Sequence, residues 1–279
     1  MIEDLLVYML NMLSTGVGNG TDSLLQSPQE YNAALYNAAL TIHSTAVKPI
    51  TMIVLAIVSV LMLATTSTRA EGDRELGVRI IAAAMFKIAL VFIVVQNAVL
   101  LLDAFANVAT TIADSANNIN VGTGTPSTPL GDALRADITK QGLTEKVTLV
   151  VLLLLPWLVS VIANVLAIVL VFIRFLQMYL LISFASLPVA FFGHEDTKSI
   201  GIGYLKGFAG VALTGTVIVI AVKLYQALMA GWGGGTSSYD GNLVGWITGN
   251  FGNFFVAPIV LIFLMFGASS LAKKLVGEA

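Results

Sequence analysis

The chain has 279 residues, of which 57% are hydrophobic and only 11% are charged. Because soluble domains carry about a quarter charged residues, this composition indicates a polytopic membrane protein. The formal net charge of -2 excludes a basic domain that holds nucleic acid by neutralising phosphates, and the lack of cysteine excludes disulfides, thiolate catalysis and zinc–thiolate sites.

Residues 1–46 are predicted to form an N-terminal amphipathic region at the membrane interface. Residues 2–13 are apolar with a few polar side chains, which suits a short helix that lies in the interface or packs on a partner. A second helix is expected after Ser27, because Pro28 stands at a first-turn position and Glu30 follows three residues after the serine. The glycine-rich stretch between the two helices is typical of a linker, since neither a strand nor a GK[ST] motif accompanies it.

Residues 47–103 hold the first two predicted transmembrane helices. These helices run over residues 49–66 and about 80–103, and each is close to the ~20 apolar residues that a spanning helix needs. A short, charged loop that contains several arginines joins them. His43, ahead of the first span, is interpreted as an interfacial residue, because one histidine without a second ligand at i+3 or i+4 is poor evidence for a metal site.

Residues 104–146 are predicted to form a polar extracellular excursion. Its middle reads NNINVGTGTPSTPLGD, which is rich in turn residues, and its flanks are expected to form helical arms. Residues 147–272 hold the remaining transmembrane helices. The first part of this region, residues 147–193, is almost continuously apolar and about twice as long as one span. Two further spans are expected at residues 207–228 and 251–271, and residues 273–279 are predicted to form a cytoplasmic tail.

The number of crossings depends on whether residues 147–193 cross the membrane once or twice. A split at Arg174 gives six crossings, but it requires a hairpin in VFIRFLQM, which contains no Gly, Pro, Asn or Asp. A single kinked and tilted span gives five crossings, with the N-terminus outside and the C-terminus in the cytoplasm. The arginines and lysines of the short loops then lie mostly on the cytoplasmic face, as the positive-inside rule requires. The sequence therefore predicts an all-α polytopic membrane protein with about five transmembrane helices, with six as the alternative.

Five residues within the predicted spans are candidates for lining a path or for a structural role. Lys87 and Arg174 are ionisable groups in apolar segments, where burial without a partner costs several kcal/mol. The simplest interpretation of both is contact with lipid headgroups, and the alternative is a cation that faces a pore or another helix. Pro188 frees a backbone carbonyl and marks a kink, a helix end or a gate. Gly203 and Gly207 form a GxxxG pattern that lets helices approach closely, within one chain or between subunits.

Enzyme signatures are missing from the sequence. It contains no HExxH, GxSxG or GxxxxGK[ST] motif, so no catalytic, cofactor-binding or metal site is predicted. Carboxylates are also scarce in the predicted spans, where Asp103 is placed near one end. Because proton- or sodium-coupled transporters usually need an acidic residue at mid-membrane, this scarcity weakens such a function.

Several stretches resemble one family of membrane subunits. The segments are YNAALTIHSTAVKPITMIVLAIVSVLML, AAMFKIALVFIVVQNAVLLLDA and FIRFLQMYLLISFASLPVAFFGHEDTKSIGIGYLKGFAGVALTG. In order and spacing they are similar to the TrbL-like polytopic inner-membrane subunits of type IV secretion and conjugative transfer systems of the Gram-positive type. The similarity covers most of residues 30–228, and Arg174, Tyr179 and Pro188 fall where that family carries similar residues. Gln177 departs from the family, which often has an acidic residue after the arginine.

The resemblance implies a membrane channel or scaffold component of a conjugative type IV secretion machine, without enzymatic activity of its own. Such a subunit is expected to form a homo-oligomer in the bacterial cytoplasmic membrane. It would contact membrane lipid, other secretion subunits, and the transfer and coupling ATPases, and it would assist single-stranded DNA with its bound relaxase across the membrane. The alternative functions are an autonomous small-molecule permease and a holin-like membrane protein.

Overall fold

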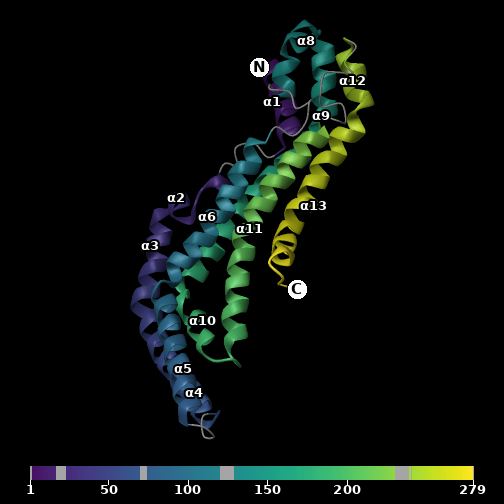
Figure 1. The fold of residues 1–279 in the computed structure, drawn as a ribbon. Coiled ribbons are helices and arrows are strands. Elements are labelled where there is room, and N and C mark those ends of the chain that lie inside the picture. Colours follow the sequence, from purple (N-terminus) through teal and green to yellow (C-terminus); the bar gives the residue numbers. More distant parts are fainter. Residues whose placement is uncertain are drawn as a thin grey trace. The chain divides into compact units, whose positions relative to one another are not determined.

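A computed structural model of the chain describes residues 2–16, 23–69, 74–119, 129–229, 239 and 241–278, without the side chains of residues 69 and 74–76. Within these residues every extended regular element is a helix, so the all-α prediction is confirmed (Figure 1). The centre of the charged loop after residue 69, the glycine linker after residue 16 and the middle of the polar excursion lie outside the described residues.

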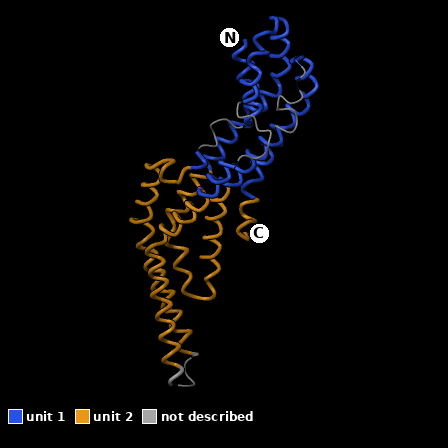
Figure 2. Tube along the Cα trace, turned by 45° about the horizontal axis from the view of Figure 1, so that its top comes forward, with its two compact units in different colours: residues 1–25, 111–173, 215–270 blue, residues 26–110, 174–214, 271–279 orange. Residues whose placement is uncertain are grey.

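Six stretches of described helix are long and apolar enough to cross a membrane. They are Ala33–Thr68, Gly77–Gln96, Ala98–Asn118, Leu143–Ser183, Lys198–Met229 and Phe251–Leu275. The third of these occupies residues for which the sequence predicts the end of a span and a polar arm. The chain divides into two compact units, which Figure 2 shows in different colours. Unit 1 consists of residues 1–25, 111–173 and 215–270, and unit 2 of residues 26–110, 174–214 and 271–279.

Helices α5 (Arg74–Gln96) and α6 (Ala98–Asn118) are separated by a single residue, Asn97. The helical hydrogen-bond pattern continues through this residue, because Asn97 N donates to Ile93 O (3.2 Å) and Leu101 N donates to Asn97 O (3.1 Å). One residue with helical bonds on both sides cannot reverse the direction of the chain. The two helices are therefore successive parts of one rod, which is roughly 65 Å long at ~1.5 Å per residue.

Helix α9 (Leu143–Ser183) contains 41 residues and passes through Arg174 without a break. A hairpin at this arginine is therefore absent, as expected from the lack of turn residues around it. Pro156 lies inside the helix. The apolar block that the sequence extends to residue 193 ends instead in two short elements, α10 (Ser186–Ala190) and η3 (Phe191–Gly193).

Unit 1 contains a small helical layer built on α1 (Ile2–Thr15). This helix packs on α7 (Leu130–Ala133) and α8 (Arg135–Lys140), and its Leu6, Leu10 and Leu13 are fully buried. The Asn11 amide fixes α7, because it donates to Asp132 Oδ2 (2.9 Å) and accepts a hydrogen bond from Asp132 N (3.1 Å). Residues 2–13 therefore pack on other helices of the same chain, and their location at the membrane interface stays a prediction. The rest of unit 1 comes from α9, from α11 (Lys198–Met229), from α12 (Leu243–Gly249) and from α13 (Phe251–Leu275).

Unit 2 is built around one long helical stretch and its neighbours. The stretch comprises α3 (Ala33–Ile42), the π-helical turn η2 (His43–Val47) and α4 (Lys48–Arg69). Helix α4 packs along α5 and against α10 (Figure 1). Helix α2 (Pro28–Tyr31) begins as the sequence predicts, with a capping box in which Glu30 N donates to Ser27 Oγ (3.3 Å) and Ser27 N donates to Glu30 Oε2 (2.8 Å). The hydrogen bonds that Ser27 N and Ser27 Oγ donate to the Glu30 carboxyl hold its pKa below its usual value.

Candidate functional site: a buried polar cluster and a charged pocket in unit 2

Three buried polar side chains meet between η2, α4 and α10. His43 Nε2 lies 3.0 Å from Ser186 Oγ, and Ser186 Oγ lies 3.0 Å from Thr51 Oγ1. Thr51 Oγ1 in turn donates to Val47 O at 2.9 Å. Since each hydroxyl has one proton, all three bonds are satisfied when His43 Nε2–H donates to Ser186, and Ser186 donates to Thr51. The cluster therefore requires a His43 ring that is protonated on Nε2.

His43 belongs to the π-helical turn, in which each turn holds more residues than in an α-helix. Such turns are rare and recur at functional sites, because they shift side chains relative to the regular helix. The His43 side chain lies within the protein, with its residue only 6% exposed. The sequence interpretation of His43 as an interfacial residue misses this contact, because its partner lies 143 positions away along the chain.

The junction between α9 and α10 lies beside this cluster. Phe184 N donates to Leu181 O and Ala185 N donates to Ile182 O, so the last turn of α9 tightens to i→i−3 bonds. The Tyr204 hydroxyl of α11 also donates to Leu181 O, at 2.6 Å. Pro188 lies in the first turn of α10, where its missing N–H leaves no helical bond unmade. It therefore marks a helix restart, in agreement with the kink or helix end that the sequence suggests.

Arg174 lies inside the helix packing of unit 2. Its residue is 2% exposed, its Nη2 donates to Ala212 O (3.1 Å), and its Cζ lies 4.8 Å from the centroid of the Phe175 ring. Its Nε and Nη1 have no hydrogen-bond partner among the described residues. Burial of a cation with unsatisfied donors is unfavourable, so Arg174 lowers the free energy of unfolding of the protein. Its burial also removes it from the lipid headgroups that the simplest sequence interpretation assigns to it.

The aromatic residues next to Arg174 hold α2 in place. Tyr31 stacks on Phe175 with ring centroids 3.8 Å apart and an interplanar angle of 7°, and the Tyr179 hydroxyl donates to Pro28 O at 2.7 Å. These contacts join the segment before α3 to the end of α9. No sequence signal identifies them, since the partners are more than 140 residues apart.

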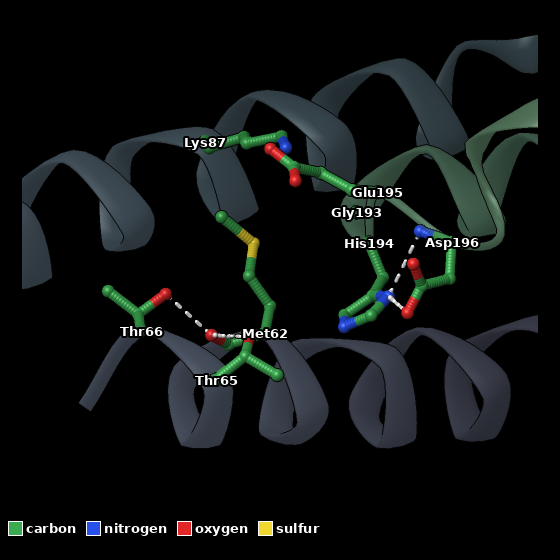
Figure 3. A pocket seen from close by; sticks show the side chains of 8 residues that line it. All are labelled: Met62, Thr65, Thr66, Lys87, Gly193, His194, Glu195 and Asp196. Carbon is green, nitrogen blue, oxygen red and sulfur yellow. Dashed lines mark hydrogen bonds and ion pairs between the residues drawn. The ribbon is translucent and has the colours of Figure 1, made fainter. Parts of the chain in front are cut away.

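Lys87 lines a pocket of about 130 Å³ between α4, α5 and the turn that follows η3. The other lining residues are Met62, Thr65, Thr66, Gly193, His194, Glu195 and Asp196 (Figure 3). Figure 3 shows the Lys87 ammonium and the Glu195 carboxylate pointing toward one another. His194 Nδ1 accepts a hydrogen bond from Asp196 N (3.3 Å) and lies 3.5 Å from Asp196 Oδ2. The ring therefore bonds the backbone when neutral and pairs with the carboxylate when protonated.

The GxxxG glycines do not mediate a close helix contact within the described chain. A Cβ added at Gly203 would meet nothing within 4 Å, and one at Gly207 would lie 3.8 Å from Glu278 Oε1, an ordinary contact. The close approaches of α11 occur at Gly201, where a Cβ would lie 2.8 Å from Pro188 O, and at Gly210, where it would lie 3.3 Å from Lys273 Cγ. The sequence pattern thus selects two glycines of the right helix but not those that its packing requires.

The described residues contain no group of three His, Asp or Glu side chains placed to hold a metal ion. Asp103, the acidic residue that the sequence places near a span, accepts a hydrogen bond from the Tyr36 hydroxyl at 2.7 Å. The candidate functional features of unit 2 are therefore hydrogen-bonded polar contacts between helices and one charged pocket.

Comparison with known proteins identifies the family. The family model described as "TrbL/VirB6 plasmid conjugal transfer like protein" matches residues 13–186, a region that includes Lys87, Arg174 and the three residues of the buried cluster. A comparison with curated proteins and one with solved structures each found no match. The family match confirms the resemblance to TrbL-like subunits. The chain therefore belongs to the TrbL/VirB6 plasmid conjugal transfer-like family and is a multi-pass membrane component of a conjugal transfer or type IV secretion system.

Proposed function

We propose that the chain is a channel or scaffold subunit that assists single-stranded DNA and its bound protein across the cytoplasmic membrane. The observation that carries this proposal is the family match over residues 13–186, a region that includes the buried cluster of His43, Thr51 and Ser186. A scaffold around a translocation path needs helices that keep their relative positions, and buried polar contacts between helices serve this purpose.

The proposed topology has five crossings, with the N-terminus outside and the C-terminus in the cytoplasm. Continuity of the helix through Asn97 supports this number, because α5 and α6 then count as one crossing and the remaining crossings are α4, α9, α11 and α13. At roughly 65 Å, the α5–α6 rod exceeds the ~30 Å hydrocarbon core, so part of it projects from the membrane or tilts within it. The cytoplasmic ends then carry the arginine-containing loop, Lys198 and the Lys273–Lys274 pair, as the positive-inside rule favours.

Lys87 and Arg174 have different roles in this proposal. A path for DNA needs a neutral or positive lining, because the phosphates carry one negative charge each. Lys87 is partly exposed and can face such a path or the headgroups at its end. Arg174 is buried, so in this conformation it acts through the packing of α9 against α11 rather than by touching the DNA.

The subunit is proposed to act as a homo-oligomer together with the transfer and coupling ATPases. The sequence has no GxxxxGK[ST] motif, so energy for transport is assigned to those ATPases. The exposed apolar side chains of the spanning helices face lipid or neighbouring subunits, and Gly203 is open to such a contact.

Conjugation assays test the proposal. A donor strain that lacks the gene is complemented with the wild-type chain, with Lys87→Ala or with Arg174→Ala, and membrane abundance is measured in parallel. We expect both variants to lower transfer at unchanged abundance, and the Lys198→Ala control to transfer normally. Full transfer by both variants would remove the two residues from the mechanism. Uptake of a solute by proteoliposomes of the purified chain would favour a permease, and depolarisation of cells on expression alone would favour a holin-like protein.

A further inference from the structure

The charged pocket around Lys87 has the size and the charge pattern of a site for a small polar group. Its volume of about 130 Å³ is well below the ~300–1,000 Å³ of pockets that enclose a whole drug-sized molecule. It contains an ammonium group on one helix and two carboxylates, from Glu195 and Asp196, on the facing turn. The Lys87 ammonium points toward the Glu195 carboxylate without forming an ion pair within 4.0 Å, so a ligand between them would meet both charges.

The mixed charges of the pocket limit the class of ligand. An inorganic anion bound to Lys87 would meet the carboxylate of Glu195, and a simple cation bound between Glu195 and Asp196 would meet the ammonium of Lys87. Either ion alone would gain one attraction and suffer one repulsion at similar range. A zwitterion that carries a phosphate and an ammonium a few bonds apart pairs with both sides. Primary ammonium groups also donate hydrogen bonds to carboxylates, which quaternary ammonium groups cannot do.

Apolar side chains adjoin the pocket on its membrane side. Leu61 lies one helical turn from Thr65 on the same face of α4, and Leu90 lies one turn from Lys87 on the same face of α5. Both leucines are exposed, at 51% and 47% respectively. Leu61 is nearer than Thr65 to the middle of α4, and Leu90 is nearer than Lys87 to the middle of the continuous α5–α6 rod. The ligand surface is therefore polar at one end and apolar at the other.

We propose that this pocket binds the phosphoethanolamine headgroup of a membrane phospholipid. Lys87 faces the phosphate. Glu195 and Asp196 accept hydrogen bonds from the ammonium, and the acyl chains follow Leu61 and Leu90 into the bilayer. The lipid would thereby join α4 and α5 to the turn before α11 at the edge of the membrane.

Lipid retention in nanodiscs tests the assignment independently of conjugation. The full chain is placed in phosphatidylcholine nanodiscs with a minority of either phosphatidylethanolamine or phosphatidylglycerol, and the lipids that remain bound after release are identified by native mass spectrometry. We expect the wild-type chain to enrich phosphatidylethanolamine over phosphatidylcholine about tenfold, and Lys87→Gln and Glu195→Gln each to abolish this enrichment. The Lys198→Gln control, which changes a neighbouring charge outside the pocket, keeps it.

Three outcomes with the wild-type chain and the single variants would overturn the proposal, and two further experiments add one such outcome each. They are equal retention of all three lipids by the wild-type chain, preference for phosphatidylglycerol, and an unchanged preference in both variants. A charge-swapped variant, Lys87→Glu with Glu195→Lys, distinguishes lipid binding from a structural ion pair. The exchange keeps the attraction between residues 87 and 195 but reverses the charges that would face the lipid. Recovery of lipid retention in this double variant would therefore contradict the orientation proposed here. Equal displacement of the lipid by soluble glycerophosphoethanolamine would show that the headgroup alone is recognised and would overturn the assignment to a bilayer lipid.

Discussion

His43 Nε2 lies 3.0 Å from Ser186 Oγ, and this contact joins the π-helical turn before α4 to the first residue of α10. Both residues are buried, and Thr51 completes the chain of hydrogen bonds. The contact thus ties the first span of the chain to the point where the long helix α9 has ended and the backbone restarts. It explains why a histidine and a serine are accommodated between otherwise apolar helices.

Ser186→Ala removes the acceptor of the His43 N–H and the donor to Thr51. Leaving a buried donor without a partner costs about 1–3 kcal/mol, so we expect the detergent-solubilised variant to unfold at a lower temperature. Ser44→Ala is the matched control, because Ser44 is exposed and its hydroxyl donates to Thr41 O, three residues earlier in the same helical stretch. In a double-mutant cycle with Thr51→Val, the two losses should be less than additive. Additive losses would show that the residues do not act as one cluster.

Gly131→Ala tests the packing of α1 on α7. A Cβ at this position would lie 2.2 Å from Val7 O, a backbone atom, so one of the two helices must move. We expect a loss of about 1–3 kcal/mol and faster proteolysis of the N-terminal helix, because the displaced helix no longer buries Leu6 and Leu10. Gly249→Ala, at a position where a Cβ meets nothing within 4 Å, is the control. Wild-type proteolysis rates in Gly131→Ala would contradict the described contact.

The contact between Glu3 and Lys146 predicts a dependence of stability on pH. The hydrogen bond from Lys146 Nζ to Glu3 Oε1 holds the pKa of the Glu3 carboxyl below its usual value of 4.5. Because the folded-state pKa is lowered, the stabilisation is present above the usual value and is lost as the pH falls through the folded-state pKa. Wild type should therefore exceed Glu3→Gln in melting temperature at neutral pH, and the difference should vanish in acid. Glu3 is partly exposed to solvent, so added salt should reduce the difference at neutral pH. A difference that grows in acid would contradict this pairing.

Arg174→Met distinguishes the effect of the buried arginine on stability from its effect on conjugation. Replacing a buried ionic group with an apolar residue of similar volume is often neutral or stabilising, by up to about 4 kcal/mol. Since Nε and Nη1 are unsatisfied among the described residues, we expect Arg174→Met to be at least as stable as wild type in detergent. If the arginine serves transfer, conjugation should fall nonetheless. A strongly destabilised Arg174→Met protein would instead indicate that the guanidinium is fully satisfied in the membrane.

Local and compositional signals predicted much of the fold. The capping box at Ser27 and Glu30 set the start of α2, and the apolar run without turn residues around Arg174 indicated a single helix there. These features depend on neighbours in the sequence, so they can be read from it. Hydropathy was less informative for Ala98–Asn118, which is the least hydrophobic of the six candidate spans. A polar arm and a spanning helix of such low hydrophobicity look alike in sequence.

Contacts between distant residues could not be predicted. His43 and Ser186 are 143 positions apart, and Asn11 and Asp132 are 121 apart. A single sequence contains no pattern that relates such pairs. For the same reason the sequence did not identify Gly201 as the closely packed glycine of α11, because its close contact is with the carbonyl of Pro188 on another helix. The same reason applies to Arg174, whose Nη2 donates to the carbonyl of Ala212, 38 positions further along the chain.

The most direct test of a role in DNA transfer is formaldehyde crosslinking of mating donor cells, followed by immunoprecipitation of the tagged subunit and detection of the transferred strand. We expect the strand to co-precipitate with this subunit, and the signal to disappear when the coupling ATPase is deleted. Absence of the strand from the precipitate, in donor cells that conjugate at the wild-type frequency, would contradict a role of this subunit in DNA transfer.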